Sequence, residues 1–186
     1  MTRIIGISGS LRRDSFNTAL LRAATPMMPD GATLAIRLIH DIPLYNFDVE
    51  TVQGMPSTVT HLKDEIAARS GLLIATPEYN NSIPGVVKNA IDWLSRPPND
   101  IPRVFGDLPV AIMGATQGAF GTILSQNAWL PVLRTLGTRH WTGGRLVVPG
   151  AAKVLDKDGN ILDEKLRERL EKFVHGFVVF VRGERH

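Results

Sequence analysis

The stretch GLLIATPEYNNSIPGVVKNAIDWL, residues 71–94, decides the fold class. It begins with an apolar run, passes through a polar segment, and ends where apolar residues such as Ile83, Val87 and Ile91 recur every three or four positions. The first pattern is typical of a strand covered on both faces, and the second of a helix with one buried face. Pro84 suits a first helical turn. The stretch therefore predicts one strand–loop–helix unit.

The same unit recurs along the chain. Strand-like apolar runs occupy residues 3–8, 32–39, 71–76, 109–116 and 145–149. Helical patterns occupy residues 16–24, 59–66, 83–94 and 123–136, and a last one follows Asp163, a candidate N-cap. Pro131 predicts a kink or a break in the fourth helix, because an interior proline costs about 3 kcal/mol. Regular alternation of this kind predicts a doubly wound α/β fold with a parallel sheet.

Two irregular stretches, residues 40–56 and 150–162, remain between these elements. Long loops in compact domains are often functional or lie at interfaces. The second contains DKDGN (residues 156–160), a turn signal that also fits a simple hairpin-like excursion.

Length and composition exclude several classes of protein. The 186 residues fit one domain, and the chain contains no cysteine, so thiolate metal sites and disulfides are ruled out. The five histidines, at positions 40, 61, 140, 175 and 186, show no metal-ligand spacing. The formal charge is +3, and the basic residues are scattered along the chain. This distribution argues against nucleic-acid binding and suits small anionic ligands. No signal peptide or membrane span is evident, so we expect a cytoplasmic protein without membrane insertion.

The loop after the first strand has the residues of a phosphate site. SGSLRRDSFNTAL, residues 8–20, combines hydroxyl side chains with Arg12 and Arg13 and leads into a helix N-terminus. Such a terminus, with its free N–H groups, suits an anion. The glycine patterns for a dinucleotide or a nucleoside triphosphate are absent. Side-chain hydroxyls suit a terminal monophosphate, which favours FMN over FAD. The alternative is that Ser15 or Asn17 only caps the helix.

Two further loops lie on the same predicted rim. PEYNNSI, residues 77–83, offers flat surfaces and hydrogen-bond donors, as a flavin ring requires, although proline and asparagine also suit an ordinary turn. Glu78 either fixes this loop or reaches a partner subunit. GATQGAFG, residues 114–121, allows close backbone approach, and Gln117 could meet the ring or the ribityl chain. The alternative for this segment is a flexible connection.

These residues resemble the NAD(P)H-dependent FMN reductase family, which includes quinone and chromate reductases. GSLRRDSFN (residues 9–17) is similar to its phosphate motif, and TPEYNNSIPGVVKNAIDW (residues 76–93) to its ring motif, with Val87 in place of the usual leucine. The resemblance covers nearly the whole chain. It implies one flavodoxin-like domain over residues 1–186, with a five-stranded parallel sheet in the order 2-1-3-4-5 and helices on both faces.

The resemblance also implies bound FMN and specific contacts. The phosphate contacts are Ser10, Arg12, Ser15, Phe16 and Asn17, the ring contacts are Pro77, Glu78, Tyr79 and Asn80, and a looser match adds Gly114, Gln117 and Gly118. It further implies a homodimer or homotetramer, in which Trp93 and Tyr45 are either interfacial or, respectively, a core and a surface residue.

The expected reaction passes electrons from NADPH or NADH through FMN to a quinone, free flavin or similar small acceptor. The cofactor carries the chemistry, so no catalytic side chain is required and none is named. Neither nicotinamide is favoured, because the sequence shows no clamp for a 2′-phosphate. An electron-carrier flavodoxin is the alternative, but such carriers are typically acidic. A phosphoacceptor domain would need acidic residues where Ser8, Gly9, Thr76 and Pro77 stand.

Overall fold

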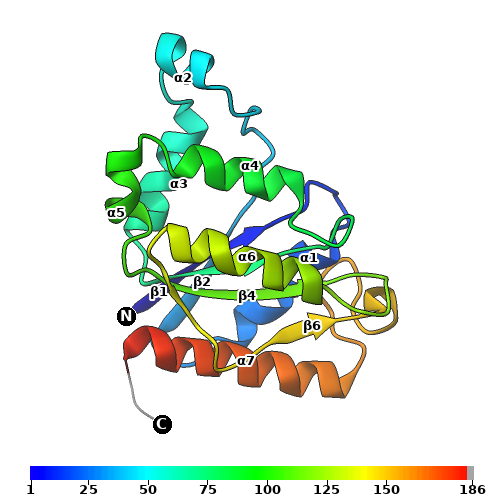
Figure 1. The fold of residues 1–186 in the computed structure, drawn as a ribbon. Coiled ribbons are helices and arrows are strands. Elements are labelled where there is room, and N and C mark those ends of the chain that lie inside the picture. The colour runs from blue at the N-terminus through cyan, green and yellow to red at the C-terminus, as the bar shows by residue number, and fades with distance from the viewer. Residues whose placement is uncertain (184–186) are drawn as a thin grey trace.

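A parallel sheet forms the centre of the molecule. The computed structural model describes residues 1–183, so His186 lies outside the described residues. Strands β1 (Thr2–Ser8), β2 (Ala32–Arg37), β3 (Gly71–Ala75), β4 (Pro109–Ala115) and β5 (Arg139–His140) pair in the order β2-β1-β3-β4-β5. A further strand, β6 (Leu146–Val148), also pairs with β4 (Figure 1). The flavodoxin-like order 2-1-3-4-5 is confirmed.

The fifth position of the sheet is divided between two short strands. β5 pairs with the first two residues of β4, and β6 pairs with residues 113–115. The apolar run at residues 145–149 predicts only β6, so the sequence missed β5. Between the two strands Trp141 turns into the core and packs edge-on against Phe173, with ring centroids 5.1 Å apart. Gly143 and Gly144 make this possible, because a Cβ at either would lie within 2.7 Å of the indole.

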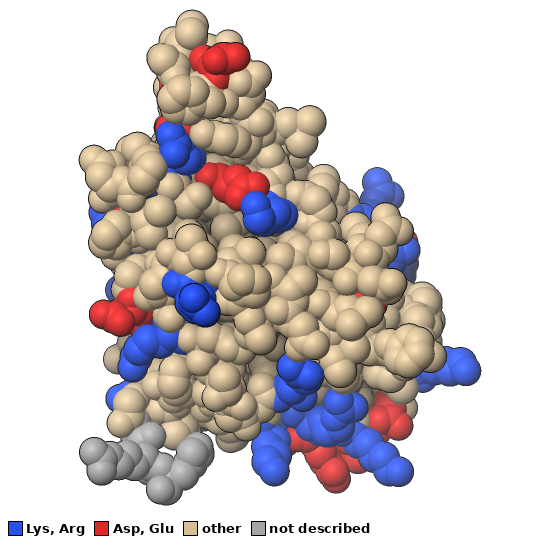
Figure 2. Space-filling model, viewed as in Figure 1, with Lys and Arg blue, Asp and Glu red and all other residues tan. Residues whose placement is uncertain are grey.

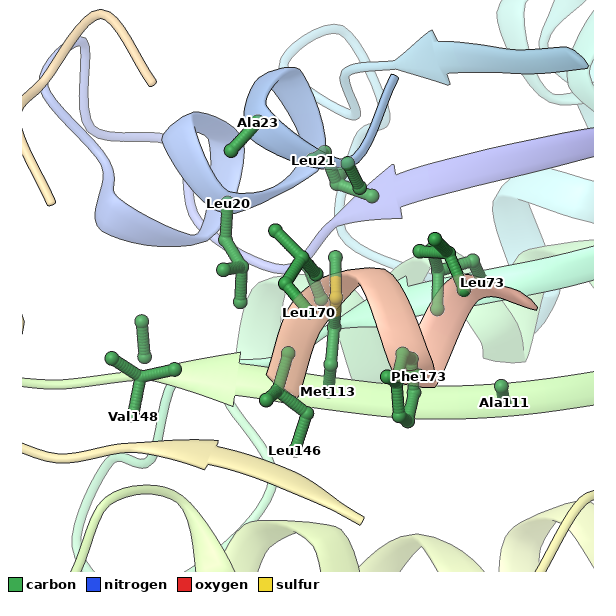
Figure 3. Packing of buried hydrophobic residues seen from close by; sticks show 14 of the residues in the cluster. Leu20, Leu21, Ala23, Leu73, Ala111, Met113, Leu146, Val148, Leu170 and Phe173 are labelled. Carbon is green, nitrogen blue, oxygen red and sulfur yellow. The ribbon is translucent and has the colours of Figure 1, made fainter. Parts of the chain in front are cut away.

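Helices cover both faces of the sheet. One face carries α1 (Phe16–Ala24) and α7 (Glu164–Arg182), and the other carries α3 (Ser57–Ala67), α4 (Gly85–Leu94), α5 (Ile101–Val104) and α6 (Ile123–Thr135). Alternate strand residues serve alternate faces: Leu73 faces α1 and α7, whereas Leu72 and Ile74 face the other layer. Figure 3 shows side chains of α1, β4, β6 and α7 meeting in the first layer. Within residues 1–183, no helix has the length and apolar character that crossing a membrane would need.

Two segments depart from the pattern expected of the sequence. Helix α6 is not split at Pro131, which is exposed, while its neighbours Trp129 and Leu133 are buried. Burial of that apolar face outweighs the cost of the proline. Residues 40–56 contain a helix, α2 (Phe47–Gln53), which projects from the body of the molecule (Figure 1).

Residues 150–162 form the hairpin-like excursion that their turn signal allows. After a short 3-10 turn (Ala151–Lys153), Leu155 and Ile161 make an antiparallel bridge. The Asp156 carboxylate accepts hydrogen bonds from the backbone of Asp158 and Asn160 and closes the turn. Asp163 then caps α7 by accepting from the Leu166 N–H at 2.7 Å, as predicted.

Candidate functional site

The loops that follow β1, β3 and β4 meet at one end of the sheet. The Gly9 N–H donates to the Ala75 carbonyl at 2.8 Å, and the Thr76 N–H donates to the Met113 carbonyl at the same distance. Gly9 also packs so closely on Pro77 that an added Cβ would lie 3.0 Å from its ring. The two loops that the sequence assigns to a phosphate and a flat ring are therefore neighbours, as the parallel topology requires.

The first loop wraps the N-terminus of α1. The Ser15 hydroxyl accepts from the N–H groups of Asn17 and Thr18, at 3.2 and 3.3 Å, so it is the helix N-cap. Ser10 and Ser15 are both buried, whereas the Arg12 side chain is exposed and lies over the Phe16 ring. The first turn of α1 carries no acidic residue. A capped, basic helix terminus with hydroxyls beside it is suited to a phosphate dianion.

Asn17 ties this helix to β4. Its side-chain amide donates to the Ala115 carbonyl at 2.9 Å, and its side-chain oxygen accepts from the Ala115 N–H at 3.0 Å. The side chain is only 2 % exposed. Beneath it, the hydroxyls of Ser8 and Thr18 lie 2.7 Å apart. One N–H of the Asn17 amide and its oxygen are thus engaged, so the side chain braces the two loops through these atoms.

The second loop contains a tight turn that explains its paired asparagines. Tyr79 and Ser82 exchange backbone hydrogen bonds, and the residues between them, Asn80 and Asn81, have φ of 50° and 60°. A turn with positive φ at both central positions is of type I′, and asparagine is among the few residues that tolerate it. Pro77 is buried behind the turn, while Tyr79 (46 % exposed) and Asn80 stand at the surface of the rim.

Glu78 joins this loop to the start of α6. Its carboxylate accepts from the N–H groups of Leu124 and Ser125, at 2.8 and 3.1 Å. A negative charge at a helix N-terminus is favourable. Glu78 therefore fixes the loop within its own chain, the first of the two roles that the sequence left open.

A buried hydroxyl network reinforces that joint. The Thr76 hydroxyl lies 2.9 Å from that of Ser125 and accepts from the Trp129 indole N–H at 3.2 Å. Sequence reasoning missed these three residues as part of the site. A threonine that ends a strand and a tryptophan on a helix carry no signal of their partnership until the fold brings them together.

The third loop is built from residues that play different parts. Gly114 lies inside β4, and a Cβ there would be 2.2 Å from both the Thr122 hydroxyl and the Thr76 carbonyl oxygen. Packing within the protein thus requires this glycine. Gln117 and Gly118 are exposed at the rim, where the Gln117 side chain accepts from the Ala152 N–H at 3.3 Å.

Trp93 and Tyr45, near α2, pack against each other. Trp93 is fully buried, and its indole N–H donates to the Pro43 carbonyl at 2.9 Å. Tyr45 packs edge-on against it at 5.0 Å and donates its hydroxyl to Glu50. Trp93 is therefore a core residue.

The comparison with known proteins agrees with this geometry. The sequence profile described as NADPH-dependent FMN reductase matches residues 2–153. The chain belongs to the NADPH-dependent FMN reductase family.

Relatives of this FMN reductase family member match over nearly their whole length. An NAD(P)H-dependent FMN reductase of Pseudomonas aeruginosa is 39% identical over 180 residues, which are 97% of this chain and 95% of the relative. A quinone reductase of Escherichia coli is 41% identical over 186 residues, with the same two coverages. Among solved structures, the flavoenzyme NAD(P)H:(acceptor) oxidoreductase FerB of Paracoccus denitrificans is 32% identical, with a TM-score of 0.86 and 99% of each chain covered.

Proposed function

We propose that this protein is an FMN-dependent NAD(P)H oxidoreductase that passes electrons to a quinone, a free flavin or a related small acceptor. The observation that carries the proposal is the contact between the two rim loops, one with the donors of a phosphate site and the other with a flat, exposed turn. Family membership and the relatives, among them reductases of FMN and of quinones, support it.

The residues present fit FMN at both ends. A monophosphate would be held by Ser10, Arg12, Ser15 and the first N–H groups of α1. These combine buried hydroxyls, a guanidinium and a helix N-terminus whose first turn carries no acidic residue. The ring would lie against the loop of Pro77, Glu78, Tyr79 and Asn80. The proposed contacts are completed by Phe16, Asn17, Gly114, Gln117 and Gly118, of which Asn17 also braces the two loops.

The protein's part in the reaction is to bind and orient FMN and to keep the loops around it fixed. Bound FMN supplies the hydride and electron transfer, so the chain needs no nucleophile of its own. Glu78 and Thr76 fix the ring loop on α6, and Asn17 fixes the phosphate loop on β4. The exposed side of the rim, at Tyr79 and Asn80, leaves room for a nicotinamide and then for an acceptor in turn.

The experiment is a test of cofactor and turnover on the purified protein. The released cofactor should be FMN and not FAD. Under anaerobic conditions NADPH or NADH should bleach the bound flavin, and a quinone should restore the colour. A protein that holds FMN tightly but is reduced by neither nicotinamide would instead be an electron carrier. Arg12→Ala should weaken FMN binding, and Arg167→Ala, at an exposed position of α7, is the matched control.

We further propose a cytoplasmic homo-oligomer. Leu44, Phe47 and Val52, on and beside α2, are 85%, 59% and 83% exposed, which suits burial against a second copy. The projecting arm, residues 40–56 with helix α2, is largely uncharged on the face seen in Figure 2, apart from acidic side chains near its end. Sedimentation should give a dimer or tetramer, and Phe47→Ser should shift it toward smaller species. Unchanged sedimentation of that variant would remove the arm from the interface.

A further inference from the structure

A large hollow lies between α7 and the segment that joins β5 to β6. It has a volume of about 680 Å³, within the range of roughly 300–1,000 Å³ that is typical of small-molecule sites. Its lining comes from residues 141–146 and 169–179, and none of the residues proposed to contact FMN is among them. The hollow is therefore separate from the candidate functional site.

The apolar part of the lining centres on Trp141. Phe173 packs edge-on against the indole, and Leu146 and Val179 extend the apolar surface. Gly176, in the middle of α7, also lines the hollow, and a Cβ there would lie 2.8 Å from the indole ring. A glycine inside a helix is unfavourable, so this one is explained by the room that the ring requires. The hollow thus has a rigid aromatic surface.

The indole N–H of Trp141 makes no hydrogen bond with any residue that the structure describes. By contrast, the indole of Trp93 donates to a carbonyl and that of Trp129 to a hydroxyl. Trp141 is only 8 % exposed, and a buried indole N–H usually finds an acceptor. Its nitrogen lies beside Gly143, which lines the hollow, because a Cβ on that glycine would be 2.5 Å from it. The hollow therefore offers an occupant a free donor.

The rim of the hollow is cationic. It carries Arg145, Arg169, Lys172 and His175, and within residues 1–183 none of the lining side chains is acidic. Lys172 makes no hydrogen bond or ion pair with any described residue. The hydrogen bond of Arg169 to a described residue uses one nitrogen, Nη2, which donates to the Val147 carbonyl at 2.9 Å. Figure 2 shows basic side chains gathered around α7, with some acidic ones among them. Arg169 and Lys172 thus keep donors for an anion.

We propose that this hollow binds a small aromatic carboxylate. The ring body would lie against Trp141 and Phe173, as apolar ligands do in pockets lined by aromatic side chains. Arg169 and Lys172 would hold the carboxylate through charge-assisted hydrogen bonds. An aromatic body suits the site better than an aliphatic chain, because a guanidinium also stacks on aromatic faces. The inference does not depend on the proposed function, since the two sites share no residue.

The first test is binding of 2-naphthoate to the FMN-loaded protein by calorimetry. 2-Naphthamide has the same rings without the charge, so its Kd should be higher by about tenfold or more. The double variant Arg169→Gln/Lys172→Gln should abolish this difference. Equal affinities of the natural protein for the two probes would overturn the proposal, as would tighter binding of octanoate than of 2-naphthoate.

A matched control lies on the same helix. Lys165→Gln/Arg167→Gln removes the same charge from exposed positions of α7 that do not line the hollow. It should keep the preference for 2-naphthoate. If both double variants lost that preference equally, the protein's overall charge would account for it, and the site would be refuted.

The second test locates the probe by NMR of the indole N–H groups. The chain has three tryptophans, and Trp141→Phe would identify the resonance of Trp141. 2-Naphthoate should shift that resonance and leave those of Trp93 and Trp129 in place. A shift of Trp129 alone would put the probe at the ring loop, to which its indole is joined through Thr76, and would refute the site.

A second copy of the chain seated over the hollow is the competing occupant. It would keep 2-naphthoate from binding and leave the Trp141 resonance unshifted. Sedimentation of Arg169→Gln/Lys172→Gln would then move toward smaller species, which would overturn the proposal. Unchanged sedimentation together with loss of 2-naphthoate binding would support it.

Discussion

Removing the Asn17 amide should both destabilise the protein and weaken FMN binding. The side chain is buried and makes two hydrogen bonds to the backbone of Ala115, which is itself 2 % exposed. Asn17→Ala would leave a buried N–H and a buried carbonyl without these partners. Each unsatisfied group costs about 1–3 kcal/mol, so the loss of both should lower the free energy of unfolding by about 2–6 kcal/mol. For a chain of this size each kcal/mol lowers Tm by roughly 2–4 °C, so a fall of at least about 4 °C is expected.

The expected effect on FMN follows from geometry. Without the brace, the first turn of α1 and the end of β4 are free to separate, so the phosphate and ring ends of the site lose their fixed spacing. A loss of about 1.4 kcal/mol in binding, or about tenfold in Kd, is the minimum we expect.

Asn89→Ala provides the matched control. The Asn89 side chain likewise makes two hydrogen bonds to backbone groups: it accepts from the Tyr45 N–H at 2.8 Å and donates to the Pro43 carbonyl at 2.9 Å. These bonds brace the region of α2. Denaturant unfolding of the apoproteins and FMN titration monitored by flavin fluorescence would compare the two variants. Equal losses of FMN affinity, or an Asn17→Ala protein as stable as the natural one, would refute the reasoning.

Three other perturbations test separate parts of the structure. Ser15→Asp keeps a capping oxygen but should weaken FMN binding by repelling the phosphate, and unchanged affinity in a titration would remove Ser15 from the site. Asn80→Val should cost about 1–2 kcal/mol in denaturant unfolding because a β-branched residue resists positive φ, whereas Asn80→Gly should be tolerated. Arg103 and Lys63 hold the pKa of Asp100 well below its usual range, so its stabilising charge is present above about pH 4 and is lost as the pH falls toward the folded-state pKa. Asp100→Asn should therefore lower Tm most near neutral pH, and a Tm difference that grows on acidification would contradict this.

Much of the fold followed from the sequence because its signals are local. Unbroken apolar runs and helical periodicity placed the strands and helices in turn, and the order 2-1-3-4-5 came with the resemblance that residues 9–17 and 76–93 carry. Strand β5 was not predicted because it has only two residues, Arg139 and His140, and neither they nor the following Trp141 and glycines form a strand pattern. Of the kink or break predicted at Pro131, the break is absent, because burial of the helix's apolar face, which a propensity does not measure, outweighs the cost of the proline.

The site was only partly readable for the same reason. Serines and arginines beside the start of a helix, and asparagines in a turn, can be recognised from the local sequence. The brace at Asn17 and the capping role of Glu78 join residues 98 and 46 positions apart. Such pairings appear only once the sheet has set its order. The contact residues assigned to FMN stay predictions until a bound cofactor is observed.

The divided outer margin of the sheet has a consequence for how the protein behaves in a crowded cell. A long, regular border strand would offer a continuous ladder to which a neighbouring molecule could add its own strand, the first step toward fibrous assemblies. Pieces of two and three residues, interrupted where the indole of Trp141 folds inward, offer no such template. Gly143 and Gly144, by letting that indole in, thus help to keep this border of the sheet from templating another copy of the chain.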